Sequence, residues 1–330
     1  MGWYPLTFEP VFKERIWGGR RLEQLYGKRL PPGVPIGESW EVTDRPEGVS
    51  VITNGPLAGR TLRELMENHR EELLGAAWDA GGKFPLLIKI LDAQDILSLQ
   101  VHPPESVAKR LGGEPKTEMW YVADAEPGAH LLVGLRRGVT REEFERKVRD
   151  GTAAECVHQV PVHKGDAMFL PAGRIHAIGA GLVLFEIQQN SDTTYRVFDW
   201  NRVGPDGKPR PLHIAEAMES IDFSDYEPDL VRTEFEKVGP VRRRPLVPEN
   251  PLFEVWEYRV DEKSGLELGD TDRPWIVAVV EGTAQVAAGE GTTTLQPGQF
   301  ALMPAVVGRF RMEGEKGTVC LVTTPKPKSA

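Results

Sequence analysis

The feature that most constrains the fold of this chain is a short pattern that occurs twice. Residues 165–171 and 298–304 each place five mostly apolar residues between a glycine and a proline. Each copy follows one strand-like run and opens another, and Gly165 and Gly298 suit the tight turn between them. A strand–turn–strand unit that repeats in this way predicts two copies of one β-barrel.

The rest of the chain also favours a mainly β fold. Three stretches have helical spacing: two begin with a capping-box pattern at Thr61 and Thr140, and the third covers residues 214–221. Nearly everything else alternates polar and apolar residues in short runs, with turns supplied by 34 glycines and 27 prolines. The expected fold is mainly β, with two jelly-roll β-barrels and a few short helices.

The repeat also predicts two domains. The first, residues 1–240, carries an N-terminal extension, the helical insertions and the metal-binding residues described below. The second, residues 241–330, is a C-terminal barrel. Residues 234–251 are rich in proline and charge, and Arg242–Arg244 within them are expected to form part of a linker at the domain junction.

The charge balance disfavours several classes of partner. The net charge is −9, and no Lys/Arg-rich run of the nucleic-acid-binding kind occurs. No leader pattern and no run of about 20 apolar residues suggests a membrane segment. Cys156 and Cys320 lack disulfide or metal-ligand spacing, which favours a reducing cytoplasm. We therefore expect a cytoplasmic protein that binds a small molecule. If that molecule carries a phosphate, this acidic protein needs lysines and arginines gathered at the site to bind it.

The strongest chemical motif follows the first copy of the repeat. From Gly165 the chain continues through Pro171 and Gly173 to His176, which is the spacing of the second cupin signature. The glycines permit tight turns at the mouth of a barrel, and the histidine then points inward. This motif predicts that His176 is a metal ligand.

Two upstream strands supply further candidate ligands. Alternate residues of a strand share a face, which groups Ser98 with Gln100 and His102, and Lys116 with Glu118. An amide oxygen, two imidazoles and a carboxylate with one open position suit a catalytic zinc ion. These four groups belong to Gln100, His102, Glu118 and His176. From spacing alone, a structural role for these four residues is as open as a metal site, because glutamine is an uncommon zinc ligand. The other five histidines are expected to be structural.

At these residues the sequence resembles type I mannose-6-phosphate isomerase in its short bacterial form. The resemblance spans nearly the whole chain and rests on several motifs that occur in the same order. They are Ile16-Trp-Gly-Gly19, Ile36-Gly-Glu-Ser-Trp-Glu41, Leu97-Ser-Leu-Gln-Val-His-Pro103, Lys116-Thr-Glu-Met-Trp120 and Ser191-Asp-Thr-Thr-Tyr-Arg196.

The resemblance implies a role for each candidate residue. The isomerase converts mannose-6-phosphate into fructose-6-phosphate through a metal-assisted enediol. One zinc ion per chain would be held by Gln100, His102, Glu118 and His176. Arg196 would be the catalytic arginine and Glu186 the candidate base, with a zinc-bound water as the alternative base. Ser98, Lys89 and Lys116 would line the phosphate and sugar pocket, and the two lysines are expected to select for the phosphate.

The sequence departs from the family pattern in two places. It has no room for the helical insertion of the long form or for its later lysine-bearing signature, so phosphate contacts from that part are not transferred. In the second repeat, Arg309 stands where a ligand histidine would fall and Val306 replaces the glycine. We therefore expect the C-terminal barrel to be metal-free and structural.

Two other functions stay open at this point. An iron-dependent cupin oxygenase would normally carry a His-x-His or His-x-Asp/Glu pair, whereas here Gln100 precedes His102 and the acid lies sixteen residues further on. A non-catalytic sugar-binding cupin would need no acid–base set, and Arg196, Glu186 and the two pocket lysines argue against it. The sequence does not predict an oligomeric state.

Overall fold

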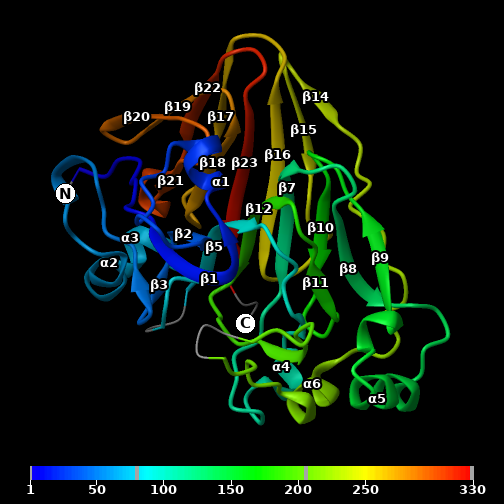
Figure 1. Cartoon of the computed structure of the whole chain (residues 1–330). Coiled ribbons are helices and arrows are strands. Elements are labelled where there is room, and N and C mark those ends of the chain that lie inside the picture. The colour runs from blue at the N-terminus through cyan, green and yellow to red at the C-terminus, as the bar shows by residue number, and fades with distance from the viewer. Residues whose placement is uncertain (1, 79–81, 204–206, 328–330) are drawn as a thin grey trace.

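The computed structural model describes residues 2–78, 82–203 and 207–327, and antiparallel sheets dominate these ranges (Figure 1). The larger sheets form two pairs that follow each other along the chain. A separate small hairpin joins β3 (Asp44–Arg45) to β4 (Gly48–Val49). The mainly β, cupin-type fold expected from the sequence is confirmed.

The first pair of sheets uses the chain up to Phe198. The order of its six-stranded sheet is β1 (Val11–Gly19), β2 (Ile36–Val42), β5 (Leu86–Ala93), β12 (Leu182–Gln189), β7 (Glu118–Ala125) and β10 (Ala167–Leu170). The order of its five-stranded sheet is β13 (Tyr195–Phe198), β6 (Leu99–Val101), β11 (His176–Ile178), β8 (His130–Leu135) and β9 (Val157–Pro161). A core that includes Trp120, Leu131 and Leu184 fills the space between the two sheets.

The second pair repeats this plan. The order of its six-stranded sheet is β14 (Glu236–Val238), β15 (Val241–Pro245), β16 (Phe253–Val260), β23 (Val319–Pro325), β18 (Trp275–Glu281) and β21 (Phe300–Met303). The order of its four-stranded sheet is β17 (Ser264–Leu268), β22 (Phe310–Gly314), β19 (Ala284–Ala288) and β20 (Gly291–Leu295). Val277, Val286 and Met312 belong to the core of this pair.

The sequence repeat marks equivalent places in the two pairs. Gly165 and Gly298 lie directly before β10 and β21, which are edge strands of the corresponding sheets. Their φ angles of 91° and 76° are in the left-handed region that favours glycine. A Cβ atom on Gly298 would also lie 2.5 Å from the ring of Tyr26, so this turn has no room for a side chain.

The two six-stranded sheets pack against each other through one large apolar core. Ile88 and Phe185 of the first sheet share this core with Phe253 and Leu321 of the second. The N-terminal segment joins the two pairs as well, because Leu6 exchanges two backbone hydrogen bonds of 2.8 Å with Leu302.

The domain boundary between residues 240 and 241 stays a prediction. The strand β13 is the last along the chain that belongs to the first pair of sheets, and β14 is the first that belongs to the second pair. The expectation of a linker at Arg242–Arg244 is wrong, because these residues lie in β15. All three arginines pack on an aromatic ring, which makes a charged run compatible with a strand: Arg242 and Arg244 lie over Phe235, and Arg243 lies over Trp256.

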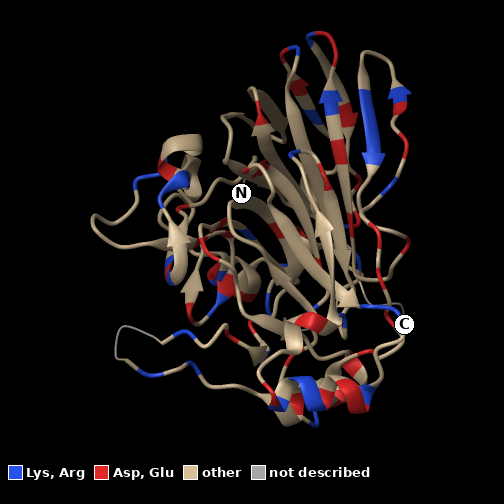
Figure 2. Ribbon diagram, turned by 45° about the vertical axis from the view of Figure 1, so that its right-hand side comes forward, with Lys and Arg blue, Asp and Glu red and all other residues tan. Residues whose placement is uncertain are grey.

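Short helices cover the ends of the sheets. They are α1 (Arg21–Tyr26), α2 (Leu62–Asn68), α3 (Arg70–Leu74), α4 (Glu105–Ala108), α5 (Arg141–Arg149) and α6 (Ile214–Ser220). Thr61 forms the predicted capping box of α2, and the Thr140 hydroxyl caps α5. The helices α4, α5 and α6 gather at the lower end in Figure 1. Charged residues are dense along α5 and also occur in strands such as β14, β15 and β16 (Figure 2). No helix within the described ranges is long and apolar enough to cross a membrane.

A buried carboxylate links the two pairs of sheets. Glu257 in β16 is fully buried and accepts hydrogen bonds from Tyr121 (3.1 Å), Arg259 (2.7 Å) and Arg244 (2.6 Å). Arg244 also donates to the carbonyl of Gly165 at 2.7 Å. Tyr121 and Gly165 belong to the first pair, so this network connects the repeat turn to the second pair.

Removing this carboxylate should destabilise the protein. Glu257→Ala would leave Arg244 without its buried partner, which should lower the free energy of unfolding by about 3 kcal/mol. Denaturant titration measures this value. The matched control is Glu315→Ala, which removes an exposed ion pair with Lys263 and should cost less than about 1 kcal/mol. Equal losses in the two variants would contradict a structural role for Glu257.

Candidate metal centre and adjoining cavity

Three ligand-type side chains meet at one end of the first pair of sheets. His176 begins β11, Glu118 begins β7, and His102 directly follows β6. The strands β11 and β6 pair with His176 opposite Gln100. One ligand atom from each of His102, Glu118 and His176 lies within 4.8 Å of the others, and all three residues are buried.

Backbone carbonyls orient both histidines. His102 Nδ1 lies 2.8 Å from the carbonyl oxygen of Thr193, and His176 Nδ1 lies 2.9 Å from that of Arg174. A hydrogen on each Nδ1 leaves the Nε2 lone pair free. The two Nε2 atoms lie 3.6 Å and 3.4 Å from different oxygens of Glu118. Proteins use this arrangement to aim histidines at a metal ion.

The protonation states also suit a cation. Burial alone would raise the pKa of Glu118, but the charges of Lys116 and His102 outweigh it and hold that pKa well below its usual range. Burial, followed by the charge of Lys116, lowers the pKa of His102 to about 4, and burial lowers the pKa of His176. At neutral pH the centre therefore has two neutral imidazoles and one carboxylate, which is the state that binds metal.

The buried oxygens of Glu118 show that this cluster has room for a further cation besides Lys116. Neither oxygen accepts a hydrogen bond of good geometry from the described residues. The ammonium group of Lys116 lies 2.7 Å from Glu118 Oε2 and 3.2 Å from His102 Nε2, but not in a direction that forms such a bond to the carboxylate. An ionised carboxylate left in this state is costly unless a cation approaches it. The residues present fit a divalent metal ion.

Gln100 lies beside this cluster. Its amide nitrogen is 3.4 Å from His176 Nε2. A half-turn of the amide group exchanges its nitrogen for its oxygen and places an oxygen donor at the same point. All four predicted ligands are therefore brought together by β6, β7 and β11.

A cavity of about 460 Å³ adjoins the cluster. Gln100 lines it together with all five predicted catalytic and substrate-binding residues. These five are Lys89, Ser98, Lys116, Glu186 and Arg196. Sequence reasoning did not single out several other lining residues with polar side chains. They are Glu14, Arg15, Glu38, Asp192, Thr194 and Arg210. Glu38, Asp192 and Thr194 lie inside the motifs that carried the family resemblance, whereas Arg210 lies in a loop without any such signal.

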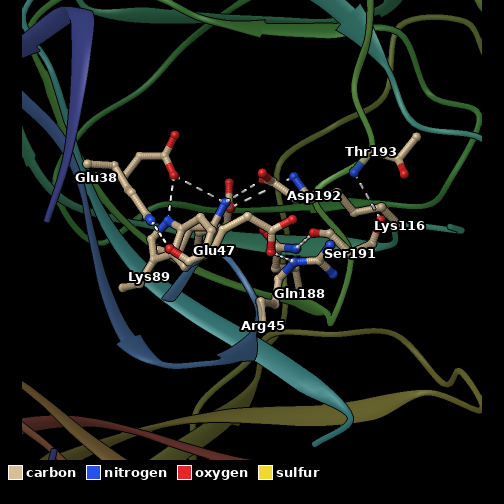
Figure 3. A network of polar contacts seen from close by, with 12 residues as sticks. Glu38, Arg45, Glu47, Lys89, Lys116, Gln188, Ser191, Asp192 and Thr193 are labelled. Atoms are coloured by element: carbon tan, nitrogen blue, oxygen red, sulfur yellow. Dashed lines mark hydrogen bonds and ion pairs between the residues drawn. The ribbon is translucent and has the colours of Figure 1, made fainter. Parts of the chain in front are cut away.

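Lys89 is surrounded by carboxylates. Its ammonium group lies 3.2 Å from Glu186, 3.4 Å from Glu38 and 4.0 Å from Asp192, and Glu38 and Asp192 are seen beside it in Figure 3. Burial opposes charge on Glu38, but Lys89 and Arg15 lower the pKa of Glu38 to about 2. The same carboxylates outweigh burial and raise the pKa of Lys89. Lys89 is therefore charged, and its charge is already compensated.

Glu186 lines the cavity, and its two carboxylate oxygens have different surroundings. Trp120 Nε1 donates a hydrogen bond to Glu186 Oε2 at 3.0 Å and fixes the carboxylate. The other oxygen, Oε1, accepts no hydrogen bond of good geometry from the described residues, although Lys89 lies 3.2 Å away and Lys116 3.9 Å away. This oxygen is free to accept a proton from a bound molecule.

Arg196 has a different environment. Its Nε donates to Ser98 Oγ at 3.2 Å, and its Nη1 donates to the carbonyl of Pro211 at 2.9 Å. No ion pair joins it to a carboxylate in the described part of the chain. Burial, followed by the charge of Arg210, lowers its pKa from the ordinary arginine value. Arg196 is thus a cation that can pair with negative charge arising in the cavity.

The second pair of sheets lacks a comparable cluster. Among residues 2–78, 82–203 and 207–327, the group formed by His102, Glu118 and His176 is the one cluster of three or more such ligand residues. Arg309 and Val306 are both exposed at the positions where the second repeat departs from the cupin pattern. The expectation that the C-terminal barrel is metal-free and structural stays a prediction.

Comparisons with known proteins place the chain in a family. Residues 6–128 match the phosphomannose isomerase type I catalytic domain. Mannose-6-phosphate isomerase ManA of Bacillus subtilis (strain 168) is 37% identical over 313 residues, which cover 94% of this chain and 96% of that protein. The mannose-6-phosphate isomerase of Streptococcus mutans serotype c is 33% identical over 312 residues, with the same coverage.

Solved structures agree with these relatives. A crystal structure of mannose 6-phosphate isomerase from Bacillus subtilis has a TM-score of 0.86 at 30% identity, covering 97% of this chain and 99% of that one. A zinc-bound mannose 6-phosphate isomerase shares the fold at 19% identity, with a TM-score of 0.78 and coverage of 98% and 99%. Similarity at this level along almost the full length shows that the chain belongs to the type I phosphomannose isomerase family.

Proposed function

We propose that this protein interconverts mannose-6-phosphate and fructose-6-phosphate with the help of one bound zinc ion. The observation that carries the proposal is one cavity, lined by Glu186 and Arg196, that adjoins a buried His/Glu/His cluster. Among the described residues no hydrogen bond holds Glu186 Oε1, and Arg196 has no ion pair. The relatives named as mannose-6-phosphate isomerases support the choice of substrate.

The proposed zinc ligands are Gln100, His102, Glu118 and His176. Nitrogen and oxygen donors in this number suit zinc with room for a substrate oxygen, and a relative of the same fold is described as zinc-bound. When bound, the ion supplies Lewis acidity that polarises the substrate oxygens. Ser98, Lys89 and Lys116 are proposed to bind the sugar next to it.

The reaction moves one proton between two neighbouring carbons. Glu186 Oε1 takes the hydrogen from C2 of the open-chain aldose as a proton and returns it to C1, while the hydroxyl hydrogen passes from O2 to O1. An enediolate forms in between, and its negative oxygen needs a fixed positive partner. Arg196 is proposed to be this partner, since it lines the same cavity and forms no ion pair with a carboxylate among the described residues.

The two alternatives have weaker support. Two histidines and one glutamate could also hold iron in an oxygenase, but the full-length relatives are isomerases. A sugar-binding cupin without catalysis would not need a glutamate oxygen kept free of hydrogen bonds beside two lysines. We also propose a cytoplasmic location, since Cys156 and Cys320 are both free and buried.

Removal of one ligand should remove metal and activity together. We expect the purified protein to hold one zinc ion per chain by elemental analysis, and His176→Ala to lose both the zinc and the isomerase activity. The control is His130→Ala, a half-exposed histidine outside the cluster, which should keep both. Two zinc ions per chain, or full activity after chelation, would contradict the proposed centre.

Arg196 should act mainly on the transition state. Because it meets negative charge only as the enediolate forms, Arg196→Ala should lower kcat by about 10²–10³-fold with little change in KM. Steady-state kinetics with mannose-6-phosphate measure both. Arg309→Ala, which removes an exposed arginine of the second pair of sheets, should leave both parameters unchanged. A raised KM with normal kcat would make Arg196 a substrate-binding residue instead.

A further inference from the structure

Glu41 is a buried acid of a family motif that the proposed function leaves without a role. Glu38, three residues earlier on β2, lines the cavity beside the metal centre. Glu41 belongs to the opposite face of the strand, where it accepts a hydrogen bond of 2.5 Å from Ser39. There it lines a second cavity, of about 480 Å³, which shares no described residue with the first.

This second cavity lies between the two pairs of sheets. Phe12 of β1 and Glu41 of β2 line it from the first pair. Thr294 of β20 and Phe300 of β21 line it from the second pair. Lys28, two residues after the end of α1, lines it as well. A molecule in this cavity would therefore contact both pairs of sheets.

Glu41 and Lys28 place a free acceptor beside a free donor. The side chain of Glu41 is 5% exposed, and its Oε1 lies 2.7 Å from the ammonium group of Lys28. Its other oxygen, Oε2, accepts no hydrogen bond from the described residues and is not sealed from solvent. Lys28 also donates to the carbonyl of Gly298 at 3.0 Å. An ammonium group has three donors, so one of them stays available after these two contacts.

The rest of the lining favours an uncharged molecule with an apolar side. Four aromatic residues line the cavity: Phe8, Phe12, Tyr26 and Phe300. The lining has two acids, Glu9 and Glu41. It also has two bases, Lys28 and Arg29, so the charges cancel. A wall of aromatic rings with a few polar groups is typical of small-molecule sites.

We propose that this cavity is a second ligand site, which binds a neutral sugar or sugar alcohol between the two pairs of sheets. Two neighbouring hydroxyl groups match the polar pair, because one accepts from Lys28 Nζ while the next donates to Glu41 Oε2. The C–H groups of the same molecule pack on the aromatic rings. The site is separate from the proposed active site and does not depend on the proposed function.

Equilibrium dialysis of the zinc-loaded protein with radiolabelled mannitol tests the site. Mannitol has no carbonyl group, so it cannot be isomerised. We expect one bound molecule per chain, and the same binding in His176→Ala, which removes a proposed metal ligand. Glu41→Gln should weaken binding about tenfold, because a neutral hydrogen bond replaces a charge-assisted one. The control is Glu9→Gln, which changes an exposed acid of the same lining and should bind as the wild type does.

A second variant tests the site without changing the buried ion pair. Thr294→Trp adds a large side chain at an exposed position of the lining, so it should fill the cavity and abolish mannitol binding, while circular dichroism checks the fold. Unchanged binding in a folded form of either variant contradicts the inference, as does the absence of saturable binding in the wild type. Loss of binding in His176→Ala also overturns it, because mannitol would then lie beside the metal centre.

Discussion

The charge of Glu118 is the constraint on which the first pair of sheets depends. A fully buried carboxylate without a well-formed hydrogen bond is expensive, and the protein tolerates it only because positive groups are brought to it. Three strands have to end at the same place to do this. β6 brings Gln100 and His102, β7 brings Glu118 with Lys116 just before it, and β11 brings His176. The backbone carbonyls of Thr193 and Arg174 then leave the imidazoles little freedom to turn away.

The same balance of charge organises the cavity beyond the metal centre. The ammonium groups of Lys89 and Lys116 lie close to the carboxylates of Glu38, Glu118 and Glu186, so their charges are compensated inside the cavity. The same contacts, together with the hydrogen bond from Trp120, hold the carboxylate of Glu186 at a fixed place. A fixed place matters for a proposed base, because proton transfer depends on the position of the base to within a fraction of an ångström.

Sequence patterns predicted the parts of the structure that depend on local spacing. The glycine–proline repeat marked equivalent turns, Thr61 and Thr140 capped helices as expected, and strand alternation grouped Gln100 with His102. Patterns failed where contacts across the fold decide. The segment that forms β15 was predicted to be a linker, because three consecutive arginines are typical of a solvated segment. In the structure, Phe235, Glu257 and the neighbouring strands stabilise these arginines. The carboxylates around Lys89 come from three distant segments, and Arg210 comes from a loop, so neither could be read from spacing along one strand.

The pairing of Leu6 with Leu302 has a consequence for the order in which the molecule is completed. Leu6 leaves the ribosome long before its hydrogen-bonding partner Leu302 in β21 is made. The apolar face shared by the two large sheets is likewise complete only after β23 has been synthesised. During synthesis the apolar face of the first six-stranded sheet is therefore exposed to solvent until the second sheet has formed. Exposed apolar faces of this kind are the surfaces that chaperones protect. The second pair of sheets thus has a part in folding, because it covers the apolar face of the first.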